Sequence, residues 1–197
     1  MKTTALLVAL LSLFFFSCEE NKDFFIYILS RNSESKEGNM VLEYNYTNQP
    51  ISHIGIALDK VYVYSMDYNK TNKQNSSLIK ERYEAFWNSK NPANNKLWRI
   101  RTTQEEYQKI QQYIDSLEKQ KLFYDLAPDT SDGLYCSELV YLALNRANPS
   151  KFKQNKISKK LKGIAKILVG SETISYYPAD FFLNYNNSIE QLNPKNY

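Results

Sequence analysis

Two short β-forming runs, separated by the turn residues Asp59 and Lys60, place the strongest constraint on the fold of this chain. Residues 53–58 and 61–66 are rich in β-branched and aromatic side chains, which is typical of strands. A connection this short allows only an antiparallel pairing of the two strands. The sequence therefore predicts a β-hairpin and, with it, an antiparallel sheet.

The hydrophobic pattern on both sides of this hairpin predicts further elements. Strands are expected at residues 24–29, 40–46 and 97–101, with a turn at residues 37–39. A helix is expected to begin after Thr103, because the side chains of Thr103 and Glu106 fit a capping box. Other helices are expected at residues 77–87, 137–147 and 157–168, and a short one from Pro178. This mixture predicts the α+β class with a mostly antiparallel sheet.

The composition fits one globular domain, which we place at residues 24–197. The chain of 197 residues is 43% hydrophobic and 23% charged and contains only five glycines, which excludes disordered, collagen-like and coiled-coil proteins. Its formal net charge of +4 is small for this length, so no nucleic-acid partner is expected.

The N-terminus has the pattern of a targeting segment. Lys2 precedes an apolar run at residues 5–16, which is too short to span a bilayer, and Ser17 and Cys18 follow. This pattern resembles a bacterial lipoprotein signal, in which the cysteine is acylated and becomes the new N-terminus. It predicts a signal peptide at residues 1–17, lipidation of Cys18 and a tether at residues 18–23. The alternative is an ordinary secretory signal with a nearby cleavage site.

A lipidated Cys18 has consequences for location and for the other cysteine. The acyl chains would hold the protein on a membrane of the bacterial cell envelope, facing away from the cytoplasm. The acidic residues after Cys18 favour the outer membrane or the cell surface over the inner membrane. A lipidated cysteine cannot form a disulfide, so Cys136 is expected to be a lone thiol.

Cys136 is expected at the start of a core helix. A turn signal at Asp132 and Gly133 precedes it, and an apolar stripe follows along residues 139–147. The helix dipole and the free backbone N–H groups would stabilise a thiolate there, so we expect a thiol pKa below the free value of about 8.5. The same N–H groups could donate to an oxyanion. Cys136 is thus a candidate nucleophile; the alternative is a small buried apolar residue.

His53 is the only histidine of the chain and a candidate base for Cys136. In the expected strand, alternation places Ile54 and Ile56 on one face and His53 and Gly55 on the other. The glycine leaves room for another element beside the histidine. The alternative is a histidine that is only part of the packing. One histidine and one free cysteine make no convincing metal-ligand set, so neither a metal nor another cofactor is expected.

Four segments together resemble the circularly permuted NlpC/P60 papain-like hydrolases of the YiiX/YaeF type: SHIGIAL…VYVYSM, LYCSELVYLAL, GNMVLEYN and YYPADFF. In that family the histidine strand precedes the cysteine helix, as it does here. The resemblance covers residues 36–185. It implies a permuted papain-like fold, in which an antiparallel sheet packs against a cysteine-bearing helix.

The resemblance also implies roles for individual residues. Cys136 would be the nucleophile and His53 the general base that then protonates the leaving group. Tyr135 and Ser137 match the cysteine motif and would contact the substrate or its oxyanion.

Family members commonly carry a third polar residue on the strand after the histidine strand, and an ungapped reading places Ser65 there. A two-residue turn would instead bring Tyr64 to the face of His53, whereas a three-residue turn brings Ser65. Asp67 lies near the end of the same strand. The third position therefore remains open between Ser65 and Tyr64, with Ser65 preferred.

Taken together, these features predict a lipid-anchored cysteine hydrolase of the amidase or peptidase kind that acts through a thioester on Cys136. The expected substrate is a cell-wall peptide or an acylated small molecule. One alternative is an acyltransferase or esterase that acts on lipids. The other is a non-catalytic envelope-binding lipoprotein that retains the fold.

Overall fold

A computed structural model describes residues 23–32, 36–47, 49–67, 78–87, 94–125, 133–185 and 188–196. The expected signal peptide, Cys18 and residues 19–22 of the tether lie outside the described residues. Among the helices within these ranges, none is long and apolar enough to cross a membrane.

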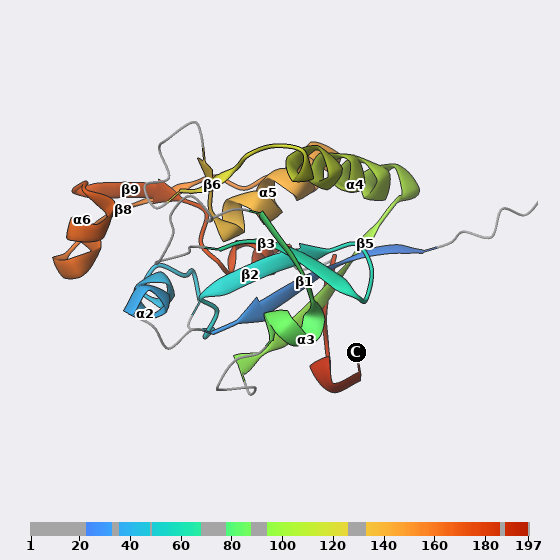
Figure 1. The fold of residues 1–197 in the computed structure, drawn as a ribbon, viewed down its shortest axis with the longest axis horizontal. Coiled ribbons are helices and arrows are strands. Elements are labelled where there is room, and N and C mark those ends of the chain that lie inside the picture. The colour runs from blue at the N-terminus through green and yellow to red at the C-terminus, as the bar shows by residue number, and fades with distance from the viewer. Residues whose placement is uncertain are drawn as a thin grey trace, which may run out of the picture.

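A six-stranded sheet forms the centre of the structure (Figure 1). Its strands lie in the order β10-β5-β1-β2-β3-β4, and each neighbouring pair is antiparallel. The bounds are β1 (Phe24–Arg31), β2 (His53–Ala57), β3 (Tyr62–Met66), β4 (Leu78–Arg82), β5 (Lys96–Thr102) and β10 (Ile189–Leu192). The predicted β2–β3 hairpin and the antiparallel sheet are confirmed.

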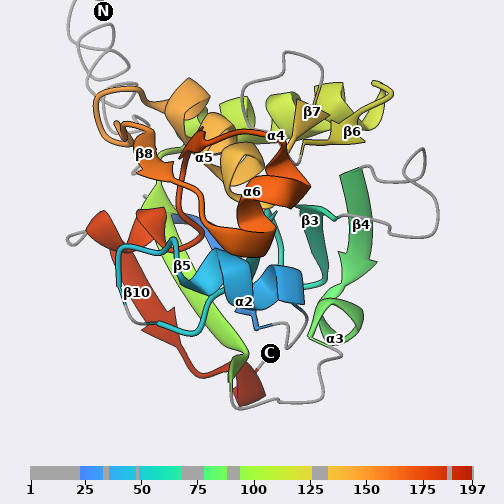
Figure 2. The same ribbon diagram turned by 90° about the vertical axis from the view of Figure 1, so that its left-hand side faces the viewer.

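Helices cover both faces of this sheet (Figure 1). Helices α4 (Gln104–Glu118) and α5 (Cys136–Ala147) lie on one face, and the short α3 (Tyr83–Phe86) lies on the other. Helix α2 (Lys36–Leu42) precedes β2. The remaining elements are β6 (Phe123–Tyr124), β7 (Gly133–Leu134), β8 (Ile157–Lys160), α6 (Gly163–Val169), β9 (Thr173–Tyr176), and the 3₁₀ helices η3 (Phe181–Asn184) and η4 (Pro194–Asn196). Strands β8 and β9 with α6 form an arm beside α2 (Figure 2).

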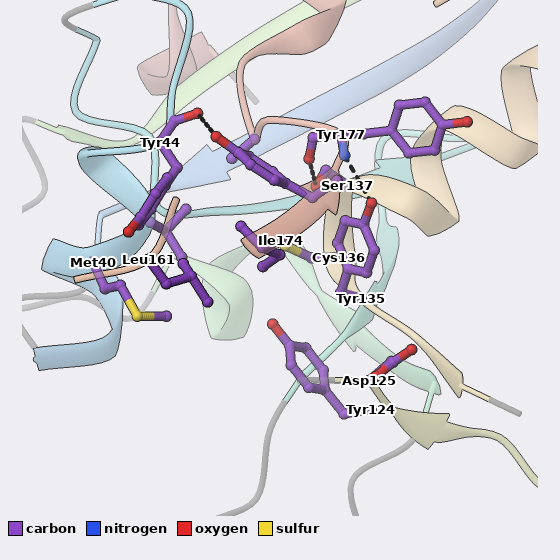
Figure 3. Close-up of a pocket in the computed structure, with 13 residues that line it drawn as sticks. Met40, Tyr44, Tyr124, Asp125, Tyr135, Cys136, Ser137, Leu161, Ile174 and Tyr177 are labelled. Atoms are coloured by element: carbon purple, nitrogen blue, oxygen red, sulfur yellow. Dashed lines mark hydrogen bonds between the residues drawn. The ribbon is translucent and has the colours of Figure 1, made fainter. Parts of the chain in front are cut away.

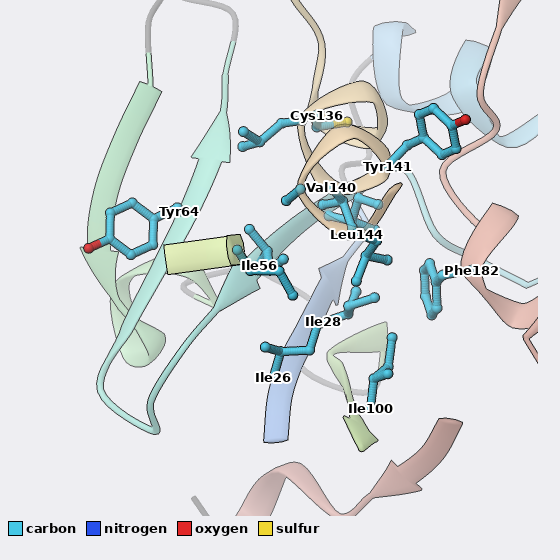
Figure 4. Packing of buried hydrophobic residues seen from close by; sticks show 14 of the residues in the cluster. Ile26, Ile28, Ile56, Tyr64, Ile100, Cys136, Val140, Tyr141, Leu144 and Phe182 are labelled. Carbon is cyan, nitrogen blue, oxygen red and sulfur yellow. The ribbon is translucent and has the colours of Figure 1, made fainter. Parts of the chain in front are cut away.

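The main core lies between α5 and the central strands (Figure 4). Val140 and Leu144 of α5 point toward Ile28 of β1 and Ile56 of β2, and all four side chains are fully buried. Burying a large aliphatic side chain contributes roughly 1.5–3 kcal/mol, so this contact holds the helix firmly on the sheet. A smaller cluster on the opposite face includes Leu29, Ala57, Val63, Tyr83 and Phe86.

Two strand and turn predictions near α2 were wrong. Residues 40–46, expected as a strand, form the last turn of α2 and the bend after it, and the turn expected at residues 37–39 lies inside the helix. Met40, Val41 and Tyr44 all line one cavity. Their spacing of one and three residues matches a helical face rather than the alternation of a strand.

Two helix predictions were also wrong in part. Residues 78–82, expected as helix, form β4, because they pair along their whole length with β3. Only residues 83–86 of that segment are helical. The helix expected at residues 157–168 is divided into β8, which pairs with β9, and α6. Gly163, at the start of α6, has a φ of 53°, a left-handed conformation that interrupts a continuous helix.

The predicted start of α4 is confirmed in detail. The Thr103 side chain accepts the Glu106 N–H, and the Glu106 carboxylate accepts the Thr103 N–H, which completes the capping box. The Glu106 carboxylate also accepts from Asn148 and Lys151, at 2.7 and 2.9 Å. A single carboxylate therefore joins the start of α4 to the segment that follows α5. Strand β5, helix α5 and the short helix after Pro178 are also confirmed.

Replacing Gly55 by alanine should destabilise the hairpin. A Cβ atom at this position would lie 2.5 Å from Val63 Cγ2 and 2.9 Å from the Tyr64 carbonyl oxygen. Overpacking of this kind lowers the free energy of unfolding by about 1–3 kcal/mol. Urea unfolding monitored by circular dichroism should show that loss for Gly55→Ala. The matched control Ser158→Ala, at an exposed strand position, should stay within about 0.5 kcal/mol of the parent. Equal stability of Gly55→Ala and the parent would show that β2 and β3 are not this close.

Candidate active site

Cys136 is the first residue of α5 and is only 5% exposed. Tyr135 precedes it in an extended conformation, with φ −109° and ψ 168°. The backbone groups of Ser137 and Ile54 form hydrogen bonds with the Cys136 thiol. The Ile54 contact places the sulfur against β2, next to the residue that follows His53. The predicted position of Cys136 at the helix start is confirmed.

The electrostatic environment of Cys136 differs from the expectation. Burial raises the pKa of the Cys136 thiol to about 11, although the backbone groups of Ile54 and Ser137 lower it. Asp67 also raises this pKa and Arg31 lowers it. The expected lowering by the helix N-terminus is present, but the loss of solvation is larger. Cys136 is therefore a neutral thiol at pH 7.

His53 is the first residue of β2 and is 8% exposed. Its ring stacks on Phe86, with ring centroids 5.5 Å apart and an angle of 30° between the planes. Burial lowers the pKa of His53 to about 4; Arg31 lowers it further, and Asp67 opposes this. Within the described residues, the buried Nε2 atom has no hydrogen-bond partner. The imidazole is thus neutral at pH 7, with a nitrogen free to accept a proton.

The β2–β3 pairing distinguishes the two candidates for a third residue. Ile56 pairs with Tyr64, which corresponds to the three-residue turn. Tyr64 lies on the α5 side of the sheet, in the main core. Ser65 lies on the other side, as His53 does, and is fully buried. Its hydroxyl has no hydrogen-bond partner in the described part of the chain, so no such bond joins Ser65 to His53.

The structure adds an ion pair next to His53 that the sequence reasoning did not identify. Arg31 of β1 pairs directly across from His53 of β2. Its Nη2 atom donates to Asp67 at 2.8 Å, and its Nη1 atom donates to the Phe86 carbonyl at 2.8 Å. These residues are 36 and 55 positions away from Arg31 in the chain. No local motif signals the cluster, because only the strand pairing brings its members together.

Tyr135 and Ser137 are both tied to the backbone of Tyr177. The Tyr177 N–H donates to the Tyr135 hydroxyl at 2.7 Å, and the Ser137 hydroxyl donates to the Tyr177 carbonyl at 2.6 Å (Figure 3). The Ser137 hydroxyl proton is therefore engaged in this hydrogen bond and is not available to a substrate. Burial raises the pKa of Tyr135, so its hydroxyl keeps its proton and can donate it. Tyr177 belongs to the YYPADFF segment, which the structure brings to the cysteine.

A cavity of about 90 Å³ opens beside Cys136 (Figure 3). Its walls come from α2, β6 and the residue after it, the start of α5, the arm and the segment after β9. Most of the lining is aromatic or aliphatic: Met40, Val41, Tyr44, Tyr124, Tyr135, Leu161, Ile174, Tyr176, Tyr177 and Ala179. Asp125, Cys136 and Ser137 complete it, and among the described residues His53 does not line it. The sulfur thus has an apolar cavity on one side and strand β2 on another.

Comparison with known proteins places this fold. No family model and no curated protein matches the chain. Among solved structures, the fold is similar to the crystal structure of the metalloprotein YiiX from Escherichia coli O157:H7, with a TM-score of 0.54 and 18% sequence identity. The match covers 85% of this chain and 94% of that one.

That neighbour is a metalloprotein, but the described residues of this chain do not fit a metal. Within those residues, no three histidine, cysteine, aspartate or glutamate side chains gather closely enough to hold an ion. What the two proteins share is the architecture: this chain has a YiiX-like, mixed α+β fold.

Proposed function

We propose that this chain is a cysteine hydrolase of the permuted NlpC/P60 papain-like kind, which cleaves amide or ester bonds through a thioester on Cys136. The observation that carries the proposal is the position of the Cys136 sulfur. It lies at the start of α5, is hydrogen-bonded to the backbone of Ile54 directly after His53, and faces an apolar cavity. A nucleophile at this position can meet a substrate carbonyl while the adjacent strand supplies a base.

In the proposed reaction, the Cys136 sulfur attacks the carbonyl carbon and the thiol proton passes to the Nε2 atom of His53. Among the described residues Nε2 has no hydrogen-bond partner, the Cys136 sulfur included, so the two groups must approach each other when the substrate binds. The Ser137 N–H and the Tyr135 hydroxyl would donate to the oxyanion. The C–N or C–O bond then breaks, and the leaving amine or alcohol takes the proton from His53. Water attacks the thioester with His53 again as base, which releases the acid and restores the thiol. Because both groups are neutral at rest, proton transfer accompanies the attack rather than preceding it.

The lining of the cavity favours an apolar group on the acyl side of the substrate. A cell-wall peptide amide remains the first substrate class, and the second candidate function is an esterase or acyltransferase acting on an acylated molecule. The aliphatic residues Met40, Val41, Leu161 and Ile174 favour this second candidate, because they bury hydrocarbon with no polar group to satisfy. Lipidation of Cys18 would place either activity at the surface of a bacterial envelope membrane.

The first test is the pH dependence of p-nitrophenyl acetate hydrolysis by the chain from Glu19 onward, which keeps all described helices and strands. Because the pKa of His53 is lowered to about 4, the neutral base predominates above that pH. We expect kcat/KM to be flat from about pH 5 to pH 8 and to fall as the pH drops through about 4. Cys136→Ala should abolish turnover, and His53→Ala should lower it by about 10²–10⁴-fold.

The surface variant Ser158→Ala serves as the matched control and should keep the parental rate. Loss of activity in Cys136→Ala but not in His53→Ala would show that His53 is not the general base. Equal rates in the parent and in Cys136→Ala would favour the non-catalytic envelope-binding module.

The second test concerns the cavity. Ile174→Trp fills it from the arm, so the variant should hydrolyse p-nitrophenyl octanoate at least about tenfold less efficiently than the parent, while acetate hydrolysis changes little. Ile167→Trp is the matched control, because Ile167 lies on the same arm, is 80% exposed and does not line the cavity. Equal effects of the two substitutions on both esters would show that the acyl group binds elsewhere.

A further inference from the structure

Three residues near His53 are called the clamp below: Phe86, which stacks on the ring; Arg31, which pairs with His53 across the strands; and Asp67, which accepts from Arg31. They come from α3, from β1 and from the end of β3. We propose that the clamp positions the His53 ring, in the place of a single polar third residue. The inference deepens the proposed function and rests on it only for its catalytic consequence.

The His53 ring is held by an aromatic contact. Phe86 is fully buried and stacks on His53, so it fixes the plane of the imidazole. Among the described residues, the buried Nε2 atom of the ring has no hydrogen-bond partner that could hold it as a polar third residue would. Ser65, which the sequence favoured for that role, has no partner for its hydroxyl. Stacking is therefore the contact that sets the ring orientation.

Phe86 is itself held by Arg31. The Arg31 guanidinium lies 4.8 Å from the centroid of the Phe86 ring and donates to the Phe86 carbonyl at 2.8 Å. One residue thus holds both the ring and the backbone of Phe86. A lysine could supply the charge but not the planar guanidinium, whose two separate nitrogen atoms reach Phe86 and Asp67 at once.

The charges near His53 balance each other. Asp67 pairs with Arg31 at 2.8 Å, so a cation and an anion lie near the imidazole together. Continuing the Ile56–Tyr64 pairing along the strands brings residue 67 opposite residue 53. The same two charges act on Glu81 of β4, whose pKa Arg31 lowers and Asp67 raises. On the α5 side of the sheet, Asp67 raises the pKa of Cys136 and Arg31 lowers it. Removing one member of the Arg31–Asp67 pair leaves the other uncompensated near His53.

The single histidine allows a direct test by NMR on the untagged chain from Glu19 onward with ring-labelled histidine. In Arg31→Gln, the loss of the cation leaves Asp67 unbalanced, so the His53 titration midpoint should rise by about one pH unit from its value of about 4. In Asp67→Asn the midpoint should move in the opposite direction. The double variant should return close to the parent.

Orientation is read separately from charge, through the ring-current shift that Phe86 imposes on the His53 resonances at pH 7. Phe86→Leu should remove this shift. Arg31→Lys should reduce this ring-current shift while leaving the titration midpoint close to that of the parent. The substitution keeps the positive charge but loses the guanidinium group that contacts both Phe86 and Asp67. For ester hydrolysis, Arg31→Gln should lower kcat by about tenfold or more with little change in KM.

Arg99→Gln is the matched control, since Arg99 also pairs with a carboxylate, Glu190, at 2.7 Å and lies 4.7 Å from the ring centroid of Phe25. It should alter neither the midpoint nor the ring shift of His53. An unchanged midpoint and ring shift in Arg31→Gln would overturn the clamp, even if Cys136 proves catalytic. The neutral-pH shift decides the matter if acid unfolds the chain before His53 titrates. If the midpoint and the ring shift change as expected but the parent shows no ester hydrolysis, the clamp stands and only the proposed function is contradicted.

Discussion

The packing of α5 against strands β1 and β2 is the contact on which the rest of the structure depends. Val140 and Leu144 bury themselves against Ile28 and Ile56, and this contact fixes the height and direction of the helix. The start of α5 then falls next to β2, where the Ile54 backbone meets the Cys136 sulfur. The apolar face of the strand thus serves the core, while its other face carries the histidine.

The same burial that stabilises the fold sets the chemistry of the site. It raises the pKa of Cys136 and lowers that of His53, so both groups are neutral at pH 7. The nearby charges of Arg31 and Asp67 largely balance each other as an ion pair. In the proposed mechanism, the nucleophile is therefore activated when a substrate carbonyl arrives, rather than resting as an ion pair with the histidine.

Local patterns in the sequence were sufficient for some elements and misleading for others. The hairpin after His53, the capping box at Thr103 and the core helix after Tyr135 follow from turn residues and periodicity, and all three are confirmed. Strand β4 was expected as helix, because its pairing with β3 is a long-range contact that outweighs local propensity.

The candidate site also contains features that the sequence predicts and features that it does not. Cys136 at its helix start and His53 at its strand start were predictable from their immediate neighbours. The contacts of Arg31 with Asp67 and Phe86 were not, since three separate elements meet there. The direction of the thiol pKa was also missed, because burial is a property of the whole fold.

The central claim is that the Cys136 sulfur forms a covalent acyl intermediate. Mass spectrometry of the chain from Glu19 onward, acid-quenched within milliseconds of mixing with p-nitrophenyl octanoate, tests it most directly. The account predicts an added octanoyl group on the peptide that contains Cys136, absent from Cys136→Ala and accumulating more slowly in His53→Ala. Release of p-nitrophenol with no acyl group on that peptide, or equal labelling of other side chains, would contradict it.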